Sequence, residues 1–237
     1  FRNTLKYSPF KSYTSLYKNY YILGQTIIDK FAAMSGMSSK FSLNYNGLEY
    51  LKEIDKNGSG AILLSAHIGN YEIAGFYLNE LKTPINIIMY DGEQNAIKET
   101  LQASGFKRDN HIIYIKNDMS HVFEIANKLI NKEIIIIHAD RFQHDMKTIE
   151  VEVLRRSASL PLGPFQIASK FKNTPIAFVF GFKRSTYKYD LYTTKPFLSA
   201  DLTLNEIVDK YVHTVETMIE KYPLQWFNYF YFWRLEV

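Results

Sequence analysis

Residues 61–75 read Ala-Ile-Leu-Leu-Ser-Ala-His-Ile-Gly-Asn-Tyr-Glu-Ile-Ala-Gly, an apolar run followed by a short polar break and a second apolar segment. The continuous apolar run at 61–65 predicts a strand that is buried on both faces. Gly69 allows a sharp bend after it, and helical spacing returns near Tyr71. His67 is therefore expected at the carboxyl end of a buried strand, where α/β sheets usually bind their ligands.

The same alternation of strand and helix continues on both sides of this segment. Apolar patterns predict helices at 12–34, 48–54, 71–81, 94–104, 119–131, 164–171 and 204–221, and strands at 41–45, 85–90, 111–115, 134–138, 175–182 and 187–193. No repeat, low-complexity tract or linker divides the chain. We therefore predict one α/β domain over residues 1–237, with a mostly parallel or mixed sheet flanked by helices.

Composition narrows the classes of function. The net charge is +4, without a dense basic block, so no nucleic-acid partner is expected. Because the chain has no cysteine, disulfides, cysteine nucleophiles and thiolate metal sites are excluded. The 18 tyrosines and 17 phenylalanines suit contact with acyl chains or with a membrane interface. No stretch approaches the roughly 20 apolar residues of a spanning helix.

His67 and Glu72 are the first candidates for chemistry. A histidine of near-neutral pKa can remove a proton from a weak nucleophile, and a carboxylate can fix its tautomer. The helix dipole also favours Glu72 in the first turn of the helix that follows. The alternative is a capped strand–helix junction whose histidine only satisfies buried backbone groups.

The motif around His67 resembles a known family. Residues 66–72 (Ala-His-Ile-Gly-Asn-Tyr-Glu) are similar to the histidine–glutamate block of the lipid A biosynthesis acyltransferases, the late lauroyl- and myristoyl-transferases. Four further segments resemble that family in the same order: 46–51 (Asn-Gly-Leu-Glu-Tyr-Leu), 136–141 (Ile-Ile-His-Ala-Asp-Arg), 160–168 (Leu-Pro-Leu-Gly-Pro-Phe-Gln-Ile-Ala) and 222–227 (Tyr-Pro-Leu-Gln-Trp-Phe). The resemblance therefore covers nearly the whole chain.

The resemblance implies a glycerolipid-acyltransferase-like fold and a location on the cytoplasmic face of the bacterial inner membrane. It also implies an N-terminal membrane segment before Phe1. It implies an acyl-carrier protein or coenzyme A thioester as donor, a lipid acceptor, a membrane surface as partner, and no metal or other cofactor. It makes His67 the base and Glu72 its partner. Backbone amides near Gly69 and the side chain of Arg141 become candidate donors to the oxyanion. The remaining expected substrate-binding positions are Asn70, Asp140 and Gly163.

Some positions depart from the family pattern. The glycerolipid type carries Asn-His, an aspartate and a Pro-Glu-Gly-Thr block, whereas this chain has Ala66-His67, Glu72 and Pro161-Leu-Gly-Pro. A glycerol-3-phosphate acceptor is therefore disfavoured. The lipid A enzymes carry an arginine in the helix after the second strand, where this chain offers only Lys98. An aryl-polyene pigment or an amino-acid lipid thus stays open as the acceptor, beside a lipid A-type glycolipid.

Other features leave alternatives open. His138, Asp140, His144 and Asp145 could suggest a metal site, but Asp140 is better interpreted as a structural or substrate-positioning residue. The pair at 155–156, Arg-Arg, is either a solvated loop or a contact for an anionic head group or an acidic carrier helix. Seven of the eight residues at 226–233 are aromatic and serve as core, acyl-tunnel lining or membrane contact. A hydrolase and a non-catalytic lipid-binding protein are the alternatives to a transferase.

Overall fold

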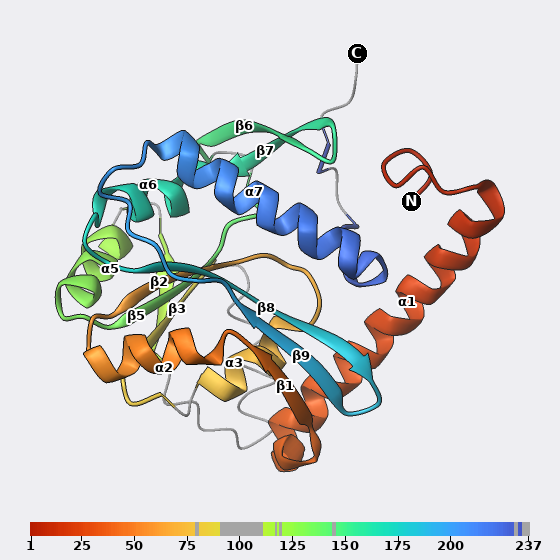
Figure 1. Ribbon diagram of the computed structural model, residues 1–237, viewed down its shortest axis with the longest axis horizontal. Coiled ribbons are helices and arrows are strands. Elements are labelled where there is room, and N and C mark those ends of the chain that lie inside the picture. Colours follow the sequence, from red (N-terminus) through yellow and green to blue (C-terminus); the bar gives the residue numbers. More distant parts are fainter. Residues whose placement is uncertain are drawn as a thin grey trace.

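The computed structural model describes residues 1–78, 81–90, 111–116, 118, 120–143, 146–229 and 232–233. Its main sheet has the strand order β1-β9-β8-β2-β5-β3-β4 (Figure 1). These strands are β1 (Ser42–Asn46), β2 (Ala61–Ser65), β3 (Ile85–Tyr90), β4 (His111–Ile115), β5 (Ile134–His138), β8 (Ile176–Ser185) and β9 (Lys188–Thr193). Every neighbouring pair is parallel except β8 with β9. The predicted α/β class and the mostly parallel sheet are confirmed.

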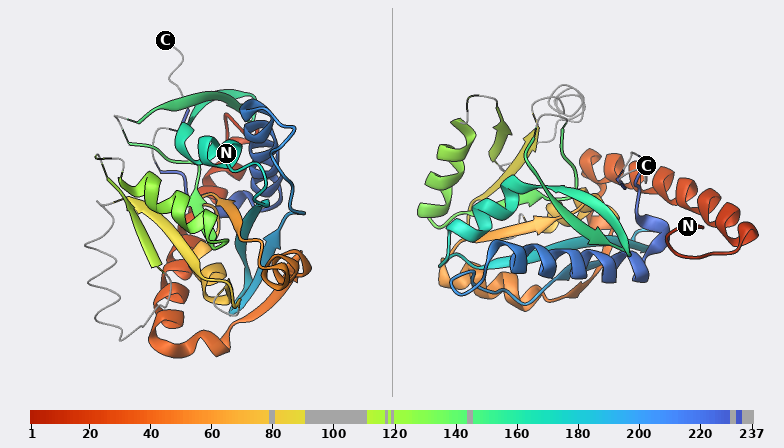
Figure 2. Two further views of the ribbon diagram at one scale, coloured as in Figure 1. Left: turned by 90° about the vertical axis from the view of Figure 1, so that its left-hand side faces the viewer. Right: turned by 90° about the horizontal axis from the view of Figure 1, so that it is seen from above.

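Helices cover both faces of this sheet. They are α1 (Pro9–Ala32), α2 (Leu48–Asn57), α3 (Tyr71–Leu78), α5 (Ser120–Ile130), α6 (Leu162–Lys170) and α7 (Leu204–Lys221), with short helical turns at Ala33–Met37, Ser38–Lys40 and Pro223–Gln225. Figures 1 and 2 show α5, α6 and α7 over one face, and α2 and α3 over the other. The helix predicted at 94–104 lies outside the described residues.

Strand β2 is apolar throughout because both of its faces are covered. Ile62 and Leu64 belong to a core formed with α5, α6 and α7, whereas Leu63 belongs to a second core with α2 and α3. All three side chains are fully buried. Successive residues of a strand point to opposite faces, so a strand between two helical layers requires an unbroken apolar run.

A β-hairpin covers the end of the molecule near α7 and was not predicted. Strand β6 (Thr148–Val153) pairs antiparallel with β7 (Arg156–Pro161) around a turn at Leu154 and Arg155. Both turn residues have positive φ angles, 50° and 63°, as tight two-residue turns between antiparallel strands require. Arg155 thus lies in the turn, while Arg156 stacks over the ring of Trp233, 4.9 Å from its centroid.

Helix α1 turns its polar side toward the domain. Ser8 caps its first turn, and the side chains of Ser15, Asn19, Thr26 and Asp29 are the buried ones. Most of its large apolar residues are exposed; they are Phe10, Tyr13, Leu16, Tyr17, Tyr20, Tyr21, Ile27, Ile28 and Phe31. This helix is therefore inverted relative to an ordinary surface helix. Within the described part of the chain, no helix is both long and apolar enough to cross a bilayer.

Gly69 has the backbone geometry that its position demands. Its φ is +69°, and a β-carbon there would lie 2.0 Å from the carbonyl oxygen of Gly181 on β8. Its amide donates to the carbonyl of Gln225 (2.8 Å). The bend after β2 is therefore in direct contact with a neighbouring strand and with the C-terminal segment.

Replacing Gly69 by alanine is expected to lower the free energy of unfolding by more than about 2 kcal/mol, because left-handed backbone strain and the clash with Gly181 add together. Gly24→Ala is the matched control, since a β-carbon at this position of α1 meets nothing within 4 Å. It should raise stability by about 0.5–1 kcal/mol. Urea unfolding of the two variants and the parent measures both changes in the free energy of unfolding. Equal stability of the two variants would contradict the prediction.

Candidate active site

His67 and Asp140 come together at the carboxyl ends of two neighbouring strands. In the parallel pair of β2 and β5, Ser65 lies opposite His138, so the residues that follow both strands are adjacent. His67 Nδ1 lies 2.8 Å from Asp140 Oδ1, and the His67 backbone amide donates to Asp140 Oδ2 (2.9 Å). Asp140 is buried. The two contacts fix the position of the imidazole relative to the carboxylate.

The expected pairing of His67 with Glu72 is wrong in this structure. Glu72 lies in the first turn of α3 and accepts from Lys30 of α1, with 2.6 Å between Nζ and Oε1. The carboxylate on His67 is Asp140, which was predicted to be a structural or substrate-positioning residue. Glu72 is near His67 in sequence, but α3 directs its side chain toward α1. Asp140 thus contacts the histidine directly, which the sequence pattern did not indicate.

The electrostatics of Asp140 favour its charged form. Burial raises the pKa of this carboxyl group, but the hydrogen bonds and the charge of His67 outweigh burial and leave the pKa below its ordinary value. Asp140 is therefore ionised at neutral pH. A carboxylate that accepts from Nδ1 places the proton of a neutral imidazole on that nitrogen and leaves Nε2 as the acceptor.

The four backbone amides from His67 to Asn70 all donate within the protein. The amide of His67 donates to Asp140, that of Ile68 to the carbonyl of Ala66 (2.8 Å), that of Gly69 to Gln225 and that of Asn70 to Gly181 (2.7 Å). These four amides therefore already have acceptors, so none of them is free to bind an oxyanion in this arrangement.

Asn70 has a structural position. Its side chain donates to the carbonyl of Thr26 on α1 (3.0 Å) and to the hydroxyl of Tyr189 (3.2 Å). Its Oδ1 accepts from the amide of Ile73 (3.2 Å) in the first turn of α3. It is 2% exposed. In this arrangement Asn70 connects the histidine loop to α1 and β9 and does not reach the cavity.

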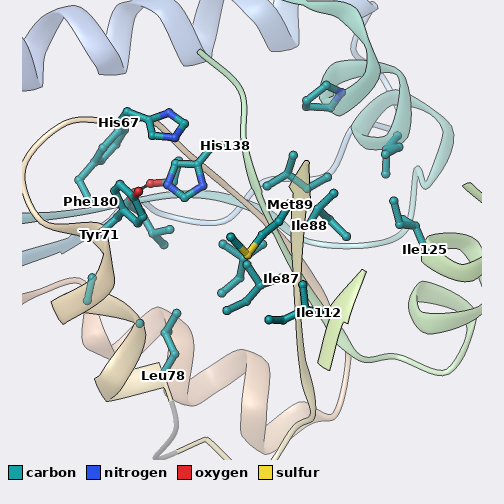
Figure 3. A pocket seen from close by; sticks show the side chains of 18 of the residues that line it. His67, Tyr71, Leu78, Ile87, Ile88, Met89, Ile112, Ile125, His138 and Phe180 are labelled. Atoms are coloured by element: carbon teal, nitrogen blue, oxygen red, sulfur yellow. Dashed lines mark hydrogen bonds between the residues drawn. The ribbon is translucent and has the colours of Figure 1, made fainter. Parts of the chain in front are cut away.

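A cavity of about 920 Å³ opens beside His67. Of the predicted site residues, His67, Glu72, Arg141 and Gly163 line it, whereas Gly69, Asn70 and Asp140 do not. Figure 3 shows His67, His138, Tyr71 and Phe180 grouped in one part of the cavity, with aliphatic side chains farther along it. These are Leu78, Ile87, Ile88, Met89, Ile112 and Ile125. The cavity thus joins a polar end to a long apolar region.

The apolar part of the cavity crosses the plane of the sheet. Ile87 and Ile136 pack with the core beneath α2 and α3, whereas Ile88 and Ile137 belong to the opposite core, and all four line the cavity. The ladder between β3 and β5 ends at the pair Ile87 and Ile136. Beyond that pair the strands are no longer matched, which gives space for a cavity lined from both faces.

Two other polar features were predicted near the site. Arg141 lines the cavity and donates from Nη2 to the carbonyl of Phe227 (3.3 Å), next to Trp226, which packs on the core. His144 and Asp145 lie outside the described residues. Among the residues that are described, no group of three or more histidine, aspartate or glutamate side chains could bind a metal ion.

The chain is similar to known proteins in both sequence and structure. The family model of the bacterial lipid A biosynthesis acyltransferases matches residues 16–234. The structure is similar to the crystal structure of the 1-acyl-sn-glycerophosphate (LPA) acyltransferase PlsC from Thermotoga maritima, with 14% identity and a TM-score of 0.49 over 92% of this chain and 98% of that one. No curated protein matches the chain.

Exchange of Asp140 for asparagine is expected to change the tautomer of His67. Asp140 accepts from both Nδ1 and the backbone amide of His67, whereas the side chain of asparagine has one oxygen and one NH₂ group. If the oxygen stays on the backbone amide, the NH₂ group faces Nδ1, and the proton of a neutral ring then moves to Nε2. Glu72→Gln should leave the tautomer unchanged, since Glu72 contacts Lys30. Ring ¹⁵N chemical shifts of His67 in both variants test this; a tautomer that responds to Glu72→Gln alone would restore the original assignment.

Proposed function

Because the chain belongs to the bacterial lipid A biosynthesis acyltransferase family, we propose that it transfers a fatty acyl group from a thioester to a hydroxyl or amine of a membrane lipid or lipid-like acceptor. The thioester is that of an acyl-carrier protein or of coenzyme A. Membership of the family makes the protein an acyltransferase. The observation that supports the proposed mechanism is the His67–Asp140 pair at the polar end of a largely apolar cavity.

In the proposed reaction His67 is the general base. With Nδ1 bound to Asp140, Nε2 of His67 accepts the proton of the acceptor hydroxyl as its oxygen attacks the thioester carbon. The buried carboxylate of Asp140 stabilises the imidazolium that forms. Collapse of the tetrahedral intermediate breaks the carbon–sulfur bond, and His67 returns the proton to the departing thiolate. The products are an acyl ester, or amide, and a free thiol.

The cavity favours transfer over hydrolysis. Its aliphatic lining suits an acyl chain, and burial of apolar surface contributes about 25 cal/mol per Å². A hydrolase needs an open, wet site instead, and a non-catalytic lipid-binding protein has no need of a carboxylate on His67. The acceptor is a lipid A-type glycolipid, an amino-acid lipid or a pigment hydroxyl.

Helix α1 supports a position at a membrane surface, which we propose is the cytoplasmic face of the inner membrane. Phe10 is 80% exposed, Tyr13 75% and Ile28 67%, so the outer side of α1 is apolar. Lys11 and Lys18 lie on the same helix, and cationic side chains are attracted to anionic lipids. An inverted helix of this kind buries its apolar side when it lies in a lipid interface.

The transfer itself is tested with labelled dodecanoyl-acyl-carrier protein or dodecanoyl-coenzyme A and a total lipid extract of the source cell. Mass spectrometry should find a newly acylated lipid that His67→Ala abolishes. Asp140→Asn should lower its rate of formation about 10²–10⁴-fold. Glu72→Gln should lower it less than about tenfold, because it removes only a partly exposed ion pair.

The outcomes separate the three classes of function. Release of free fatty acid alone would identify a hydrolase. The absence of any product, or a product that forms equally with His67→Ala, would contradict catalysis by His67 and leave a lipid-binding protein. The mass of a genuine product identifies the acceptor.

Membrane contact through α1 is tested by binding to vesicles of phosphatidylglycerol and phosphatidylethanolamine. The double variant Phe10→Ser and Ile28→Ser should bind at least about tenfold more weakly, because each fully buried side chain of this size contributes about 1.5–3 kcal/mol. Ile130→Ser with Leu198→Ser is the control, since both residues are exposed but lie off α1. Equal losses in both double variants would exclude α1 as the contact.

A further inference from the structure

Acyl transfer through a tetrahedral intermediate requires a hydrogen-bond donor for the carbonyl oxygen as it becomes negative. The amides of the histidine loop do not serve, because all four from His67 to Asn70 donate within the protein. A side chain near His67 that has no acceptor of its own can supply this donor.

His138 is such a side chain. It is the last residue of β5, two residues before Asp140, and its ring lines the cavity. The centroids of the His138 and His67 rings are 4.5 Å apart, and Tyr71 packs against His138 at 4.3 Å. Nε2 of His138 is buried and has no hydrogen-bond partner among the described residues. An unpaired buried polar atom costs about 1–3 kcal/mol, so its presence beside a base needs an explanation.

The surroundings of His138 keep its ring neutral. Burial lowers its pKa, the nearby His67 and Arg141 lower it further, and Asp140 offsets only part of this, so that the pKa falls to about 3. A neutral imidazole carries one N–H donor and cannot compete with His67 for the proton of the acceptor. Neutral histidines of lowered pKa serve as electrophiles toward a carbonyl in other enzymes.

We propose that the ring of His138 turns when the thioester enters the cavity, so that Nε2, buried before binding, donates a hydrogen bond to the oxygen of the thioester carbonyl and of the tetrahedral intermediate. This inference rests on the proposed function. As the acceptor oxygen attacks, the carbonyl π electrons move to the oxygen, where the N–H of His138 stabilises them. Collapse re-forms the carbonyl and expels the thiolate, which takes its proton from His67. His138 gives up no proton, so the balance of the reaction is unchanged.

Arg141 is the alternative donor that the sequence suggested. It lines the cavity, but its Nη2 donates to the carbonyl of Phe227. His138 is in ring contact with His67, whose Nε2 is the reacting atom of the base. The ring contact with the base therefore favours His138 over Arg141 as the donor.

The test compares two substitutions of similar size. His138→Leu removes the donor, whereas His138→Gln keeps an amide N–H at about the reach of Nε2. Thiol release from dodecanoyl-coenzyme A, in the presence of the lipid extract in detergent micelles, follows the reaction with a thiol reagent, because the protein has no cysteine of its own. Thermal unfolding of each variant shows whether it is folded.

At saturating extract, kcat of the folded His138→Leu variant should fall about 10²–10³-fold, with the apparent KM for the extract unchanged. The His138→Gln variant should recover at least about a tenth of the parent rate. A raised apparent KM with an unchanged kcat would instead show that His138 binds the acceptor. An equal loss of kcat in both variants would show that its role is only packing. Either result overturns the proposal. Failure of the proposed function is distinct, because a hydrolase would release the thiol equally without the extract, and a protein without catalysis would leave thiol release unchanged by His67→Ala.

Discussion

The parallel pairing of β2 with β5 is the constraint on which the site depends. Register places Ser65 opposite His138, so the chain leaves both strands at the same edge of the sheet and brings His67 against Asp140. The pairing is rigid because both strands are buried between two helical layers. A slip of one residue would reverse the face of every side chain on the strand, and this fixes the register.

A second set of buried polar contacts ties α1 to the same loop. Asp29 of α1 forms an ion pair with Lys183 and accepts from the hydroxyl of Tyr189 (2.5 Å), and Tyr189 in turn accepts from Asn70. Lys30 binds Glu72 one residue further along α1. The polar side of α1 is thus satisfied by the domain, which explains why its apolar side faces outward. The same helix therefore carries the proposed membrane-binding surface on its outer side and contacts the histidine loop on its inner side.

Much of this architecture could be read from short-range patterns. The apolar run at 61–65, the break at Gly69 and the return of helical spacing near Tyr71 correspond to β2, the bend and α3. The hairpin of β6 and β7 was missed, although Thr148–Val153 alternates as a strand with one exposed face does. Its turn residues, Leu154 and Arg155, are not those that usually indicate a hairpin. The role of Asp140 was missed for a different reason.

The sequence by itself determined the strands of the main sheet, the α/β class and the position of His67 at a strand end, because these follow from local periodicity. Only the tertiary structure decided which carboxylate meets the histidine. Glu72 is five positions away but faces Lys30, whereas Asp140 is 73 positions away and in contact. The reason is that strand order joins residues distant in the chain, and the direction of α3 turns a near residue away.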